Sequence, residues 1–180
     1  RSRRSERAGG RTILSRKRIF KGRLINVFAG KKKLPGGRIA YFEQIDHPGS
    51  SVILPLALGK IVFIRQYRAV IGKYIWELPA GTIARGETPY ACAKREITEE
   101  TGYKVKNLRQ IGAIYTTPGF CNEKIYIFKA DCIKKKTPRR EKDEQIRVKL
   151  FSRKEAKGLF KRGKITDSKT IATLAFANII

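Results

Sequence analysis

The segment at residues 81–103 constrains the fold more than any other part of the chain, because it carries helix signals at both ends. Thr88 suits the N-cap of a helix, where a side-chain hydroxyl accepts a hydrogen bond from a free backbone N–H. Pro89 suits the first helical position, and Gly102 suits the left-handed residue that ends a helix. The spacing therefore predicts a helix over residues 89–101.

The predicted helix gathers like charges on one face. Residues three and four apart on a helix are neighbours, so Glu96, Glu99 and Glu100 project together. Each like-charge pair costs about 0.2–0.5 kcal/mol in water, and Arg95 offsets one charge through an i, i+4 pair with Glu99. The remaining charge favours a hard divalent cation, Mg²⁺ or alternatively Mn²⁺. A solvated acidic face, the commonest outcome for a charge run, is the other interpretation.

The chain as a whole is strongly basic. Its 41 Lys and Arg against 15 Asp and Glu give a formal net charge of +26. This charge attracts polyanions such as nucleotides, nucleic acid or anionic membranes, and it is equally expected of a heat-adapted protein. Basic runs at residues 31–33, 134–136 and 139–140 come without an RNP, KH or zinc-finger pattern. A basic nucleic-acid-associated protein is therefore the less favoured alternative function, and we expect nucleic-acid binding to be weak and electrostatic only.

Histidine and cysteine usage excludes several chemistries. His47 is the sole histidine, which removes most schemes that rely on a histidine base or metal ligand. Cys92, Cys121 and Cys132 form no C-x-x-C pair, which argues against a zinc site and a disulfide framework. No apolar run approaches the roughly 18 residues of a spanning helix, and the N-terminus lacks a signal-peptide core. We expect a soluble cytoplasmic protein that does not bind membranes.

Short runs rich in β-branched and aromatic residues alternate with turn signals, which predicts strands. Expected strands are residues 18–28, 38–45, 51–56, 61–67, 76–78, 108–115, 124–132 and 145–151, and further expected helices are residues 153–161 and 168–178, the last capped by Asp167 or Ser168. This order favours a mixed α/β sandwich over a doubly wound sheet.

The same pattern divides the chain into three expected parts. Residues 1–11 are basic and lack apolar periodicity, so we expect a flexible tail. Residues 12–45 are expected to form a small N-terminal antiparallel sheet, with a hairpin turn that contains Pro35. Residues 46–180 are expected to form the main domain.

The complete signature around the predicted helix resembles the Nudix box, with no departure at its fixed positions. It reads Gly81, five residues, Glu87, seven residues, Arg95-Glu96, an aliphatic, any residue, Glu99-Glu100, any residue, Gly102. The resemblance implies a Nudix-type α/β/α sandwich with a mixed sheet. It also implies a loop–helix–loop that binds catalytic divalent cations and cleaves a nucleoside diphosphate linked to another moiety.

The resemblance assigns roles to matching positions. It implies metal ligation by Glu96, Glu99, Glu100 and the backbone carbonyl of Ala80, orientation of a carboxylate by Arg95, turns at Gly81 and Gly102, and loop support from Glu87. Residues beyond the box are similar to the ADP-ribose pyrophosphatase branch, notably Gln66-Tyr67-Arg68, Trp76-Glu77-Leu78-Pro79-Ala80-Gly81, and Pro118 at 15 residues past Tyr103. That branch implies Mg²⁺-dependent hydrolysis of ADP-ribose to AMP and ribose 5-phosphate. Another sugar nucleotide, NADH, FAD or a damaged nucleotide is the alternative substrate.

Four further residues complete the predicted site. Glu123 is our candidate for the general base, beside the catalytic Glu99 and Arg95, although a solvated loop carboxylate is the alternative. Arg68 is expected to hold a phosphate or to be a surface charge, and Pro118 and Phe120 are expected near the substrate. Adenine would stack on an aromatic ring chosen from Tyr41, Phe42, Trp76 and Phe120, each of which is more often a core residue. The N-terminal sheet implies, through the resemblance, a homodimer with shared sites.

Overall fold

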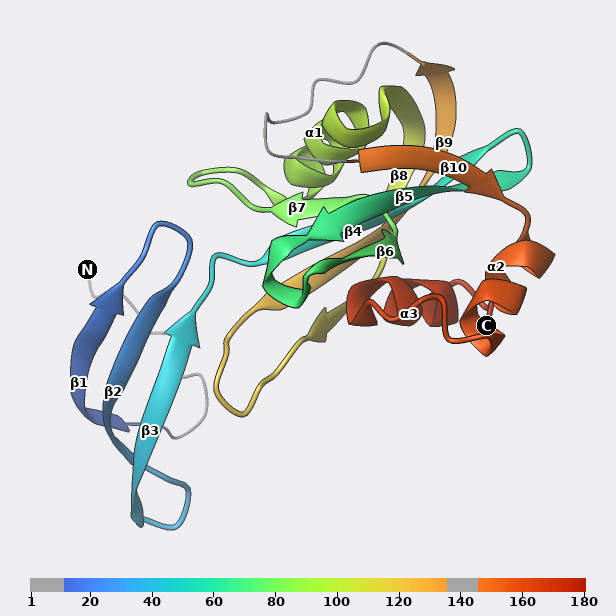
Figure 1. Ribbon diagram of the computed structural model, residues 1–180. Coiled ribbons are helices and arrows are strands. Elements are labelled where there is room, and N and C mark those ends of the chain that lie inside the picture. The colour runs from blue at the N-terminus through green and yellow to red at the C-terminus, as the bar shows by residue number, and fades with distance from the viewer. Residues whose placement is uncertain (1–11, 136–145) are drawn as a thin grey trace. The chain divides into compact units, whose positions relative to one another are not determined.

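A computed structural model describes residues 12–135 and 146–180 (Figure 1). The predicted tail and the basic run at residues 139–140 lie outside the described residues. The chain divides into two compact units. One comprises the residues up to His47 together with Thr117–Glu123, and the other comprises Pro48–Thr116 with Lys124–Ile180.

The first unit is built on a three-stranded antiparallel sheet of β1 (Thr12–Lys21), β2 (Asn26–Lys33) and β3 (Ile39–Asp46), in that order. The single strand predicted over residues 18–28 is wrong, because the chain turns at Gly22. The N–H of Gly22 donates to the carbonyl of Ile25 at 2.9 Å, and a Cβ at Gly22 would meet that oxygen at the same distance. A glycine is therefore needed for the turn that separates β1 from β2.

The loop Thr117–Glu123 packs against β3 within the first unit. The N–H of Ile45 donates to the carbonyl of Phe120 at 2.7 Å, and the N–H of Asn122 donates to the carbonyl of Ile45 at 3.2 Å. These bonds make a short parallel bridge between Ile45 and Cys121. The side-chain oxygen Oδ1 of Asn122 also accepts from the N–H of His47 at 2.8 Å, so the loop is held to the strand at several points.

The second unit contains a seven-stranded mixed sheet. Its strands are β4 (Ser50–Ala57), β5 (Lys60–Arg68), β6 (Lys73–Glu77), β7 (Ala80–Thr82), β8 (Tyr103–Tyr115), β9 (Lys124–Lys135) and β10 (Ile146–Phe151). The order is β10-β5-β4-β9-β8, with β6 paired to β5 and β7 paired to β4. Only β4 and β9 run parallel among these pairs, which makes the sheet mixed as predicted.

Helices cover both faces of this sheet (Figure 1). Helix α1 (Pro89–Thr101) lies on one face, and α2 (Arg153–Lys161) and α3 (Ser168–Phe176) lie on the other. A 3-10 turn at Ala69–Ile71 connects β5 to β6. The predicted α/β/α sandwich is therefore confirmed. Among the described residues, no helix has both the length and the apolar character needed to cross a membrane.

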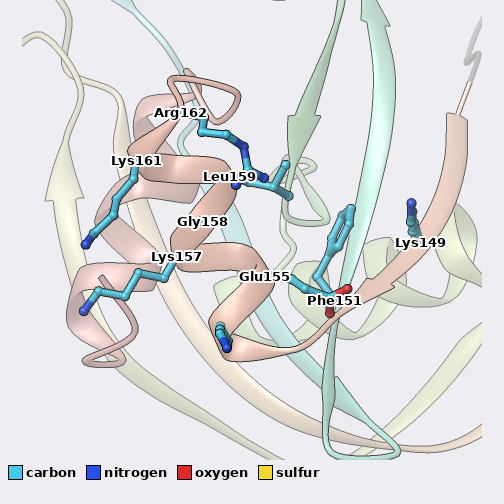
Figure 2. A pocket seen from close by; sticks show the side chains of 9 residues that line it. Lys149, Phe151, Glu155, Lys157, Gly158, Leu159, Lys161 and Arg162 are labelled. Atoms are coloured by element: carbon cyan, nitrogen blue, oxygen red, sulfur yellow. The ribbon is translucent and has the colours of Figure 1, made fainter.

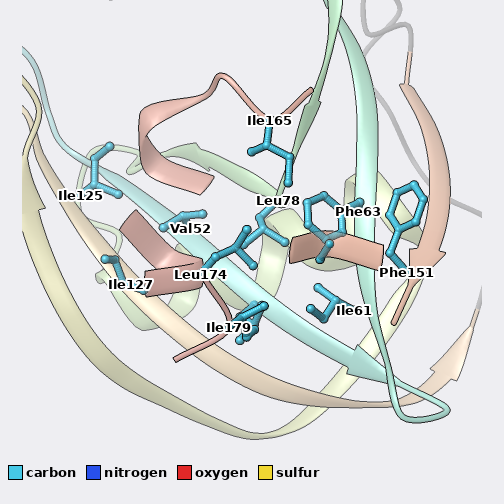
Figure 3. Packing of buried hydrophobic residues seen from close by; sticks show 12 residues of the cluster. Val52, Ile61, Phe63, Leu78, Ile125, Ile127, Phe151, Ile165, Leu174 and Ile179 are labelled. Atoms are coloured by element: carbon cyan, nitrogen blue, oxygen red, sulfur yellow. The ribbon is translucent and has the colours of Figure 1, made fainter. Parts of the chain in front are cut away.

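Strand β4 supplies the core on both faces, because its successive side chains alternate. Ile53 is fully buried toward α1, where it clusters with Ala93 and Phe128. Val52 and Leu54 are fully buried in a second cluster, which contains Phe63 from the sheet, Ala156 from α2 and Leu174 from α3. Figure 3 shows that second cluster, in which the side chains converge from the sheet and the helices. Burying one such side chain contributes about 1.5–3 kcal/mol.

The two helix ends that the sequence indicated are confirmed. The hydroxyl of Thr88 accepts from the N–H of Ala91 at 3.1 Å. Gly102 has φ of 76° and its N–H donates to the carbonyl of Thr98 at 2.9 Å. Cys92, Ala93 and Ile97 are buried on α1, and Glu100 is buried with them, so this carboxylate lies on the side of the helix that packs against the sheet.

Candidate active site

Arg95 of α1 links two glutamates of the same helix to one glutamate of the loop that precedes it. Its Nη1 donates to Glu96 Oε1 at 2.6 Å and to Glu99 Oε2 at 3.0 Å, which confirms the predicted i, i+4 pair. Its Nε and Nη2 donate to Glu87 at 2.9 and 3.0 Å, and Nη2 also donates to the carbonyl of Thr82 at 3.2 Å. The hydrogen bond to Glu87 raises the pKa of Arg95 above its ordinary value, with further help from Glu96 and Glu99.

Glu87 braces the loop that leads into α1. It accepts from Arg95 and from the N–H of Ala84, the latter at 2.9 Å. The hydrogen bond from Arg95 is the main cause that lowers the pKa of Glu87. The residue therefore has the contacts of a loop support.

Gly81 lies where no side chain fits. A Cβ at this position would stand 1.9 Å from Oε1 of Glu96 and 2.0 Å from its Cδ. The turn role expected for Gly81 is wrong, because Gly81 lies in strand β7 and is not among the described glycines with positive φ. Its function is close approach: the bare Cα lets the carboxylate of Glu96 lie against the strand. Gly102, in contrast, does have the left-handed backbone of a turn.

Glu100 is a buried carboxylate. It is 2% exposed, and its Oε2 accepts from the backbone N–H of Ala80 at 3.1 Å. Ala80 and Glu100 are 20 residues apart in sequence, so α1 and β7 bring together two positions that the resemblance assigns to one metal site.

A cavity of about 460 Å³ collects these groups within the second unit. Its lining consists of Gln66, Arg68, Arg95, Glu96, Glu99, Glu100 and residues 80–84. Gln66 Oε1 is buried and accepts no hydrogen bond from any described residue. A buried acceptor of this kind calls for a donor from a ligand or from water.

The donors around the cavity fit a hard divalent cation. Three carboxylates and the backbone at Ala80 offer oxygen, which Mg²⁺ and Mn²⁺ prefer, and the cavity lining holds no sulfur or imidazole ligand. Within residues 12–135 and 146–180, no three His, Cys, Asp or Glu already stand in the arrangement of a metal site. Instead, one nitrogen of Arg95 holds Glu96 and Glu99. The chemistry of the donor set, rather than a preformed cage, is what fits the ion.

A network that the sequence did not indicate reaches the cavity through Arg68. Its Nε and Nη2 donate to the two carboxylate oxygens of Glu77, each at 2.6 Å. Lys169 Nζ donates to Glu77 Oε2 at 2.5 Å and to Asp167 Oδ1 at 2.7 Å. Asp167 caps α3 by accepting from the N–H of Thr170 at 2.9 Å. Glu77 is fully buried, so it joins β5, β6 and α3 beneath the cavity.

One local signal could have revealed Glu77. It stands between Trp76 and Leu78 at the end of an apolar strand, where a carboxylate is rarely buried unless it is paired. Its partners, Arg68 and Lys169, are 9 and 92 residues away, and no local pattern points to the second.

Three other predicted residues lie in the first unit and do not line the cavity. Glu123 Oε1 is 3.5 Å from His47 Nδ1. Pro118 and Phe120 are exposed on the loop Thr117–Glu123, with Phe120 54% exposed. Trp76, one of the four aromatic candidates, packs against the core of the second unit, as expected for a core residue.

The carboxylates and arginines that line this one cavity are groups suited to binding a divalent cation and phosphate oxygens. The NUDIX domain model matches residues 46–174. The chain therefore belongs to the Nudix hydrolase family, which confirms the resemblance and the enzyme class.

Similar proteins agree with this assignment. The chain is 32% identical over 169 residues to an ADP-ribose pyrophosphatase of Bacillus subtilis (strain 168), covering 92% of this chain and 91% of that protein. It is 34% identical over 164 residues to a methanol dehydrogenase activator of Bacillus methanolicus, covering 89% of each. A solved structure described as an ADP compounds hydrolase shares the fold, with a TM-score of 0.81 at 19% identity over 93% of this chain and 92% of that chain.

Proposed function

We propose that this protein hydrolyses ADP-ribose to AMP and ribose 5-phosphate in the presence of Mg²⁺, with Mn²⁺ as the alternative ion. The observation that carries the proposal is that Glu96, Glu99, Glu100 and Arg68 line one and the same cavity. A diphosphate needs charge neutralisation and a phosphate clamp at one place, and this lining provides groups for both. The similar ADP-ribose pyrophosphatase supports the choice of substrate.

We assign separate roles to the carboxylates and to Arg68 of the cavity. Glu96, Glu99, Glu100 and the Ala80 carbonyl would hold Mg²⁺, which neutralises charge on phosphate oxygens and lowers the pKa of bound water. Arg68 is oriented by the two bonds that its Nε and Nη2 donate to Glu77, and its Nη1 takes no part in those bonds. That nitrogen is placed to donate to a phosphate oxygen. Water attack on one phosphorus breaks the bridging P–O bond.

Two assignments carry over from the sequence as proposals. Glu123 is our candidate to take the proton of the attacking water, supported by its carboxylate character and its place on a loop. Pro118 and Phe120, on the same loop, are our candidates for substrate contacts. Phe120 has the exposed ring that a base-stacking role needs.

The substrate is tested by hydrolysis of a panel with Mg²⁺. We expect kcat/KM for ADP-ribose to exceed that for another sugar nucleotide, NADH or FAD by at least about tenfold, since a polar pocket discriminates strongly. Phosphate release after phosphatase coupling measures the rates, and chromatography identifies AMP. A flat profile, or a best substrate without an ADP-ribose core, contradicts the proposed substrate but leaves the enzyme class intact.

We also propose that the chain forms a homodimer through the sheet β1–β3. Six of its apolar side chains expose 49–80% of their surface, namely Ile13, Leu14, Ile19, Phe20, Ile39 and Tyr41. So much exposed apolar surface on a small sheet marks an interaction site.

We expect sedimentation equilibrium to give a mass of twice 20.5 kDa for the wild type. The double variant Phe20→Glu with Tyr41→Glu should give a monomer. Leu58→Glu, on an exposed turn, is the control. A wild-type monomer refutes the dimer.

A further inference from the structure

One face of the strands β10, β5 and β6 carries aromatic rings and cations and lies opposite the catalytic cavity. Directly paired residues of antiparallel strands share a face, and the pairs here are Arg147 with Arg65, Arg65 with Trp76, and Tyr67 with Tyr74. Gln66 and Arg68, which line the cavity, alternate with these residues and therefore point to the other face. We call Arg65, Tyr67, Tyr74, Trp76 and Lys149 the aromatic–cationic face.

The side chains of this face contact one another in an unbroken series. The rings of Tyr67 and Tyr74 are 5.2 Å apart, and the guanidinium of Arg65 lies 5.5 Å from Tyr74 and 5.8 Å from Trp76. Trp76 is 5.0 Å from Phe151, over which Lys149 Nζ lies at 5.1 Å. Tyr67 and Tyr74 are 41% and 42% exposed. Rings and cations are thus presented together, with the two tyrosines open to solvent.

Beside this face, a groove of about 670 Å³ runs between β10 and α2 (Figure 2). Its charged lining is Lys149, Lys154, Lys157, Lys161, Arg162 and one acid, Glu155. Figure 2 shows Phe151 between Lys149 on the strand and Arg162 on the helix side. Lys154, Lys157 and Lys161 recur at helical spacing, about 5–6 Å between neighbouring Cβ atoms. The groove is a row of cations that continues from the aromatic–cationic face.

A ligand for this surface must offer repeated negative charge and flat rings. Single-stranded nucleic acid offers both, because phosphates match the lysine row and every base has a π-face that stacks on aromatic rings. A duplex keeps its bases stacked inside and uses only the cations. An anionic membrane could use the lysine row and the exposed Val70 and Ile71 of the β5–β6 turn, but it offers no flat ring for Tyr67 and Tyr74 to stack on.

We propose that the aromatic–cationic face and the β10–α2 groove bind single-stranded nucleic acid, at a site separate from the catalytic cavity. The proposal goes beyond the hydrolase function and does not rest on it. No sequence motif predicts this surface, because its residues come together only when β10, β5 and β6 pair.

Fluorescence anisotropy of the full chain with a labelled 12-nucleotide oligouridylate tests the cations. We expect Lys154→Glu with Lys157→Glu to weaken binding at least about tenfold at about 0.15 M salt. The salt slope should fall by about 1.4, at about 0.7 per lost contact. Lys104→Glu with Lys106→Glu, on exposed positions of β8, makes the same change in net charge and should alter affinity less than about threefold. Equal losses in the two variants overturn the proposal.

The rings are tested by Tyr67→Ala with Tyr74→Ala. We expect about a tenfold loss of affinity for oligouridylate, because each stacked base contributes to binding, and no change for inorganic polyphosphate. Circular dichroism melting verifies that each variant is folded. A variant that binds oligouridylate like wild type overturns the proposal. So does a 12-base-pair duplex bound as tightly as the single strand, or phosphatidylserine vesicles that compete at equal phosphate concentration.

Discussion

Replacing Glu96 and Glu100 together by glutamine should lower kcat/KM for the Mg²⁺-dependent hydrolysis by at least about 10³-fold. Loss of one group that stabilises developing charge costs about 10²–10³-fold, and this pair supplies two of the three carboxylates in the cavity. Each substitution keeps size and shape but removes a negative charge. Steady-state phosphate release at saturating Mg²⁺ measures the loss. Retained hydrolysis contradicts the assignment of these residues to the metal.

The fold should survive these substitutions. Glutamine keeps a side-chain oxygen, so position 100 still accepts the N–H of Ala80 that Glu100 accepts at 3.1 Å. Glu155→Gln is the matched control: the residue lies on α2 outside the cavity, and glutamine also satisfies a capping box. Its kcat/KM should equal that of wild type.

Two single variants test the roles of Gly81 and Glu123 separately. Gly81→Ala keeps every carboxylate but drives its Cβ into the space of Glu96 Oε1, 1.9 Å away. Because the end of a flexible side chain can move, we expect a loss of activity with little loss of stability.

Glu123→Gln should lower kcat with little change in KM if Glu123 takes a proton in the reaction.

The local features of the site were predictable from the sequence because they depend on neighbours in the chain. Thr88, Pro89 and Gly102 determine both ends of α1 through caps that involve only a few residues. The i, i+4 pair of Arg95 and Glu99 follows from helix geometry alone.

Features that depend on distant partners could not be predicted. The carboxylate of Glu77 meets Lys169 across 92 residues of chain, and only the packing of α3 on the sheet brings them together. The association of the loop Thr117–Glu123 with β3 depends on backbone bonds to Ile45, which any residue can make. The motif indicates that Gly81 is important, but it does not show why a glycine is needed there. The reason is close contact with Glu96, which belongs to another element.

Glu77→Gln should lower the free energy of unfolding by about 3 kcal/mol at neutral pH. Glu77 is fully buried between Arg68 and Lys169, and removing one member of a buried pair leaves the remaining charges uncompensated, at a cost of about 3–5 kcal/mol. The low end applies because the Arg68 side chain is 38% exposed and reaches water. Urea unfolding measures the difference. Glu99→Gln, a half-exposed surface pair, should change stability by no more than about 1 kcal/mol.

This loss should shrink in acid. Burial raises the pKa of Glu77, but the hydrogen bond from Arg68 and the charges of Lys169 and Arg68 outweigh it, so the pKa lies below its ordinary value of 4.5. A carboxylate with a lowered pKa contributes stability that is complete above the unfolded-state value and is lost as the pH falls through the folded-state value. The unfolding free energies of wild type and Glu77→Gln should therefore begin to converge below about pH 4.5. A gap that is the same at about pH 7 and about pH 3 would show that the lost stability comes from packing and not from the charge of Glu77.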